Sequence, residues 1–146
     1  MGRFLNPNNS TFQVSVDSKI YVDKSGIINY TNSVISTRQA FICNSRPRRF
    51  GKSMTADMLT AYYSKGCDSE EMFSGLDVSR ADDFKKHLNK YDVIHFDVQW
   101  FIKPGTDVNN IVSIIQEAVL QELREAYPEI INDSVVNIAD ALSKIN

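Results

Sequence analysis

Apolar residues recur at helical spacing in two long segments of the chain. After Gly51 the apolar positions fall on one helical face and Gly66 stands where a C-terminal cap would, which predicts a helix of about four turns over residues 51–65. The apolar positions of this helix are Met54, Met58, Leu59 and Tyr62. A second amphipathic helix is predicted from Val108 to near Pro128. Its apolar positions are Val108, Ile111, Val112, Ile115, Val119, Leu120 and Leu123.

Three other segments have the pattern of strands. Residues 19–22 (KIYV) and 91–98 (YDVIHFDV) alternate, and residues 39–44 (QAFICN) form a compact apolar run typical of a strand buried on both faces. Ser25 is expected to cap a helix whose apolar positions are Ile27, Ile28, Val34 and Ile35. Strands that alternate with helices predict an α/β fold, a parallel sheet flanked by helices. Three strands are fewer than the ~5 to 6 of an ordinary sheet, so the sheet is expected to be incomplete.

Shorter elements complete this prediction. Residues 68–73 and 82–88 have the pattern of short helices, and Pro104 and Gly105 break the chain before the second long helix. Asp133 is expected to cap a last helix with three residues turned inward, namely Val135, Ile138 and Leu142. No repeat or linker divides the 146 residues, which predicts one unit.

Composition narrows the class of protein. The chain is 42% hydrophobic and 23% charged, as in one ordinary globular domain. Sixteen Lys and Arg against eighteen Asp and Glu leave a net charge of −2, so no overall positive field attracts nucleic acid or acidic membranes. No apolar run approaches the ~20 residues that span a bilayer, and residues 1–10 lack a signal-peptide core. We expect a cytoplasmic protein. Cys43 and Cys67 have no neighbouring ligands that would indicate a disulfide framework or a zinc site.

The segment FICNSRPRRFGKSMTADML carries the candidate chemistry. A predicted strand, a polar loop and a helix that opens with Gly51, Lys52 and Ser53 have the order of a phosphate-binding loop. The first N–H groups of a helix lack intrahelical partners and lie at the positive end of its dipole. Gly51 allows close approach of phosphate oxygens to the backbone. Lys52 would lie against the β- and γ-phosphates, and the hydroxyl of Ser53 would ligate Mg²⁺.

Four positive charges lie within seven residues of this segment, at Arg46, Arg48, Arg49 and Lys52. Positive side chains at a helix N-terminus are unfavourable unless an anion accompanies them, which supports an anion site. Arg46 occupies a position where the pattern GxxxxGK[ST] has glycine, so the entrance of the loop must differ from the usual shape. A solvated charged face, or a helix that merely begins with this tripeptide, would explain the same residues.

The stretches IYVDKSGII, ICNSRPRRFGKSMTADML, YYSKGC, MFSGL and YDVIHFDVQWF, in this order, resemble the amino-terminal part of the AAA-ATPase-like family of prokaryotic proteins. The resemblance covers roughly residues 4–102, and RPRRFGKS is its most specific element. It implies ATP and Mg²⁺ as cofactors and a degenerate, arginine-rich P-loop (Walker A). The implied nucleotide-binding residues are Arg48, Arg49, Phe50, Gly51, Lys52, Ser53 and Met54, with Ser53 as the metal ligand.

The resemblance also implies a longer protein, often followed by a restriction-like nuclease domain. Residues 1–146 are then expected to form a single partial domain, truncated before the acidic strand that completes the magnesium site. Asp97 is a weaker substitute for that acidic residue, and a polar strand end is the preferred interpretation. Asp23 and Lys24, in YVDKS, are either near the nucleotide or part of an internal ion pair or helix start.

Two functional hypotheses follow. The first is ATP binding, with hydrolysis undecided. The second is a non-catalytic interaction module or gene remnant whose arginines make weak contact with the phosphates of nucleic acid. The small number of strands leaves apolar helix faces without cover, which predicts self-association or dependence on a further carboxy-terminal segment.

Overall fold

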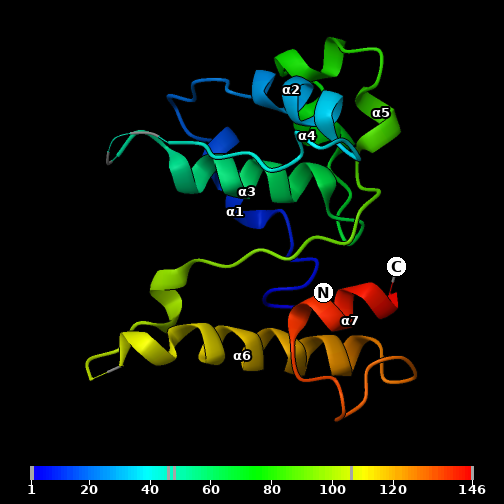
Figure 1. Ribbon diagram of the computed structural model, residues 1–146. Coiled ribbons are helices and arrows are strands. Elements are labelled where there is room, and N and C mark those ends of the chain that lie inside the picture. The colour runs from blue at the N-terminus through cyan, green and yellow to red at the C-terminus, as the bar shows by residue number, and fades with distance from the viewer. Residues whose placement is uncertain (1, 46, 48, 106, 146) are drawn as a thin grey trace. The chain divides into compact units, whose positions relative to one another are not determined.

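The computed structural model describes residues 2–45, 47, 49–105 and 107–145. The chain divides into two compact units, each with its own helices (Figure 1). The first unit comprises Asn6–Val93, and the second comprises Gly2–Leu5 together with Ile94–Asn146. Each unit is built around a separate cluster of buried apolar side chains.

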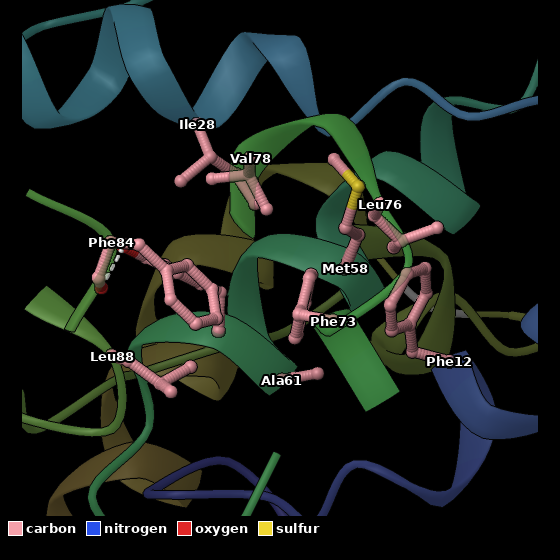
Figure 2. Packing of buried hydrophobic residues seen from close by; sticks show 10 residues of the cluster. Phe12, Ile28, Met58, Ala61, Phe73, Leu76, Val78, Phe84 and Leu88 are labelled. Carbon is pink, nitrogen blue, oxygen red and sulfur yellow. Dashed lines mark hydrogen bonds between the residues drawn. The ribbon is translucent and has the colours of Figure 1, made fainter. Parts of the chain in front are cut away.

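The first unit is built around helix α3 (Lys52–Tyr63), which contacts α1 (Ser10–Val16). The remaining elements of this unit are α2 (Gly26–Val34), α4 (Glu70–Phe73), the 3₁₀ helix η1 (Asp77–Arg80) and α5 (Phe84–His87). Met58, Ala61 and Tyr62 are buried on α3, at the spacing of one helical face. Figure 2 shows Met58 and Ala61 among side chains from the surrounding elements. The packing of this face against the other buried side chains holds α3 in place within the first unit.

The second unit is built around the long helix α6 (Ile111–Ala126), preceded by the 3₁₀ helices η2 (Val98–Phe101) and η3 (Val108–Asn110). Val119, Leu120 and Leu123 of α6 are buried together with Ala141 of α7 (Ile138–Ile145). The carboxylate of Glu122 accepts hydrogen bonds from the backbone N–H groups of Phe4 and Leu5, both at 3.0 Å. Charge-assisted bonds of this kind tie the amino-terminal segment to α6.

The predicted parallel sheet is wrong. Within the described ranges the structure contains no strand, and only the isolated bridges Ser64↔Tyr91 and Leu5↔Ile94 have a ladder's pairing. The segment predicted as a strand buried on both faces is irregular, and its Phe41 is 96% exposed. In the segment 19–22, Ile20 is 87% exposed. A short apolar run indicates β propensity. It does not indicate the distant strand that must hydrogen-bond to its backbone N–H and C=O groups, so it cannot specify a sheet by itself.

The helix predictions are confirmed for α2, α3, α4, α5 and α6, with boundaries shifted by a few residues. The last helix begins at Ile138 instead of following Asp133, because the side chain of Asn137 accepts the N–H of Asp140 at 2.8 Å. Val135 is buried as expected, whereas Leu142 is 41% exposed. Helix α1 was not predicted from the sequence. Among the residues described, none of the helices combines the length and apolar character needed to span a bilayer.

Candidate functional site at the start of helix α3

Gly51 marks the point where the loop becomes helix α3. Its backbone is left-handed, with φ +77° and ψ 32°, a conformation that glycine adopts without the cost of a Cβ clash. The carbonyl of Gly51 accepts both the N–H and the hydroxyl Oγ1 of Thr55, each at 3.0 Å. Thr55 is buried, so these two bonds fix the first turn from inside the unit. The N–H groups of Lys52, Ser53 and Met54 come before the first N–H that bonds within the helix, so they have no acceptor inside α3.

The described part of the loop carries a second left-handed residue. Arg49 has φ +66°, which is uncommon outside glycine, and the N–H of Phe50 donates to the carbonyl of Pro47 at 3.4 Å. The side chain of Phe50 is 61% exposed. Arg46 and Arg48 lie outside the described residues, so their predicted roles stay predictions. The loop therefore approaches α3 through a tight backbone turn at residues 49–51.

Lys24 reaches this turn from the start of α2. Its ammonium Nζ donates to the carbonyl of Phe50 at 3.2 Å, across 26 residues of sequence. A Cβ placed on Gly51 would lie 2.9 Å from the same Nζ. Glycine at position 51 thus satisfies two demands at once, a positive φ and close approach of a lysine ammonium.

Asp23 fixes the backbone beside Lys24. Its carboxylate accepts the N–H of Ser25 and the N–H of Asp77, both at 2.7 Å. Partial burial would raise the pKa of the Asp23 carboxyl, but these backbone hydrogen bonds, with the charge of Arg80, outweigh it and lower the pKa below its ordinary value. The Asp23 carboxylate is therefore held by backbone N–H groups, and the Lys24 ammonium donates to the carbonyl of Phe50.

The electrostatics of the α3 start favour an anion. The first turn of α3, all of it described, contains no acidic side chain, and Lys52 is its first residue. Lys24 and Arg49 add positive charge to the adjoining loop. The helix dipole also places positive charge at this end, so the dipole and these side chains together attract a negatively charged group. This is the chemical basis on which a phosphate group fits these residues.

The predicted strand before the loop is missing from this site, so the strand, loop and helix order of an ordinary P-loop is not reproduced. Asp97 is not a strand end either. It precedes η2, and its carboxylate accepts the N–H of Gln99 at 2.8 Å. Within residues 2–45, 47, 49–105 and 107–145, no three His, Cys, Asp or Glu side chains converge as a metal site would require.

The role of Thr55 in fixing the first turn of α3 was not predicted, although a threonine four residues after Gly51 is a local signal for it.

Comparison with known proteins identifies the family of the chain. A family model described as "Predicted AAA-ATPase" matches residues 10–145, so the chain belongs to the AAA-ATPase-like family. No curated protein and no solved structure matches the chain. Family membership indicates nucleotide binding as the general class of function.

Proposed function

We propose that the chain binds ATP, together with Mg²⁺, at the start of α3. The carrying observation is the left-handed Gly51 directly before a helix whose first two residues are Lys52 and Ser53. A helix N-terminus preceded by such a glycine offers backbone N–H groups to phosphate oxygens. Membership in a family described as predicted AAA-ATPases makes a nucleotide the phosphate compound of choice.

Each residue has a distinct part in this proposal. The N–H groups of the first turn donate hydrogen bonds to the phosphate oxygens, Lys52 adds an ammonium, and the Ser53 hydroxyl is the protein's ligand for Mg²⁺. When bound, Mg²⁺ would neutralise part of the phosphate charge. Arg48 and Arg49 supply further positive charge, and Phe50 and Met54 adjoin Gly51, Lys52 and Ser53 in the sequence. The exposed ring of Phe50 offers an apolar face to a nucleotide base.

Titration calorimetry with MgATP tests the proposal. Lys52→Ala should weaken affinity about 10- to 100-fold, since a charge-assisted contact is worth roughly 1.5–3 kcal/mol. Lys86→Ala removes an exposed lysine of the same unit and should leave the affinity unchanged. Equal affinity of the wild-type and Lys52→Ala proteins would exclude the site.

Ser53→Ala separates the metal from the phosphates. It should weaken binding in the presence of Mg²⁺ and have little effect when EDTA removes the metal, because the hydroxyl acts through the cation. A competition experiment covers the nucleic-acid alternative. A labelled oligonucleotide that binds with a steep salt dependence and is not displaced by ATP would indicate phosphate contact of another kind.

A further inference from the structure

We propose that Lys24 is a positioning residue of the nucleotide loop, which sets the direction of the peptide between Phe50 and Gly51. The part of this inference that concerns ATP binding rests on the proposed function. Its structural part stands on the hydrogen bond from Nζ of Lys24 to the carbonyl of Phe50, at 3.2 Å. That carbonyl belongs to the peptide that leads into the left-handed Gly51.

The base of the Lys24 side chain is fixed on both sides. Asp23 holds the N–H groups of Ser25 and Asp77, and the fully buried Ser25 accepts the N–H of Val78 on its Oγ at 3.1 Å. The carbonyl of Lys24 itself accepts the N–H of Ile27 at 3.2 Å. The backbone at residues 23–25 is therefore tied to η1 and to the start of α2, so the lysine extends from a fixed point.

The bond to Phe50 determines more than the position of one carbonyl. A trans peptide is planar, and its C=O and N–H point in opposite directions. When Lys24 holds the C=O of Phe50, the N–H of Gly51 in the same peptide is turned away from Lys24. That N–H is the first of the four at the start of α3 that have no intrahelical acceptor, the set that binds phosphate in helix N-terminal sites.

The neighbourhood of Gly51 agrees with this role. Any side chain at position 51 would place its Cβ 2.9 Å from Nζ of Lys24, so the lysine occupies the space that glycine leaves. Rotation of the Phe50–Gly51 peptide would break the bond to Lys24. The lysine thus favours a single orientation of this peptide before any nucleotide arrives, and this preorganisation reduces the ordering required on binding.

Two variants distinguish this role from general destabilisation. Lys24→Met keeps the length and apolar stem but removes the donor, whereas Lys24→Arg keeps N–H donors that can reach the carbonyl. In the nucleotide-free protein, Lys24→Met should raise amide hydrogen exchange several-fold at Phe50 and Thr55, whose N–H groups donate to the carbonyls of Pro47 and Gly51 beside the held peptide, while the buried amides at residues 58–62 keep wild-type protection. Lys24→Arg should restore most of the protection. Wild-type exchange at Phe50 and Thr55 in Lys24→Met would overturn the inference.

Nucleotide affinity supplies the second readout. Lys24→Met should weaken MgATP binding about 10-fold, and Lys24→Arg should recover most of the loss. If Lys52→Ala weakens binding and Lys24→Met does not, the positioning role alone fails. If Lys52→Ala has no effect, the proposed function fails, and the exchange measurement still decides whether Lys24 orders the loop.

Discussion

Gly51 meets two requirements at once, a left-handed backbone and close packing against the ammonium of Lys24. Its substitution is therefore expected to have effects that substitution of an ordinary glycine does not have. Gly51→Ala puts a Cβ on a residue at φ +77°, which we expect to cost roughly 1–2 kcal/mol of unfolding free energy. The added methyl must also displace Nζ of Lys24, so MgATP affinity should fall as well. Thermal denaturation and calorimetry of the same samples measure both effects.

Gly26→Ala is the matched control. Gly26 begins α2, and a Cβ there meets nothing within 4 Å. Alanine should leave stability unchanged or raise it by about 0.4–1 kcal/mol through the unfolded chain, with no change in nucleotide affinity. Equal stabilities for the Gly51→Ala and Gly26→Ala proteins would show that the left-handed conformation of Gly51 is not required in solution.

At this scale the candidate site could be predicted only where its residues are neighbours in sequence. The types and order of Gly51, Lys52 and Ser53 alone predict the start of a helix that binds an anion. Lys24 could not be assigned to the site in this way. Its partner Phe50 lies 26 residues away, and their contact depends on how the chain folds back toward α2. The motif YVDKS placed Asp23 and Lys24 among the candidates, yet the sequence left open whether they pair with each other or serve the loop.

Helix α3 holds the site because its opposite end is anchored in the first unit's core. Met58 is 1% exposed, and we expect Met58→Ala to destabilise this unit by about 2–5 kcal/mol through the cavity that it leaves. Met54, one turn nearer the loop, is only half-buried, so Met54→Ala should cost clearly less. Chemical denaturation followed by circular dichroism measures the difference. Equal losses would show that the packing in Figure 2 does not describe α3 in solution.

Elements differ in how much of their structure is local. The helices were predictable because a 3.6-residue period identifies both the element and its buried face, as Val119, Leu120 and Leu123 show on α6. The predicted strands failed because pairing is not local. Tyr91 has the strand pattern, but its only ladder pairing in the described chain is one isolated bridge with Ser64. A parallel sheet therefore could not be read from three apolar runs.

The two units bury separate apolar clusters and still expose many large apolar side chains. Phe41 is 96% exposed and Ile20 87% in the first unit, and Val136 is 72% exposed in the second. Each square ångström of apolar surface removed from water contributes about 25 cal/mol, so residues this exposed favour contact with another surface. We accordingly expect the chain to self-associate as its concentration rises.

Sedimentation velocity over a hundredfold concentration range tests this expectation. The weight-average sedimentation coefficient should increase with concentration, because association driven by buried apolar area follows mass action. The double variant Ile20→Ser and Phe41→Ser should shift the increase to higher concentration, since it removes the two most exposed of these side chains. Lys86→Ala, which changes an exposed polar position, should leave the curve where it is. A wild-type protein that sediments as one monomeric species throughout the range would contradict the expectation, because the exposed side chains of Phe41 and Ile20 would then not drive association.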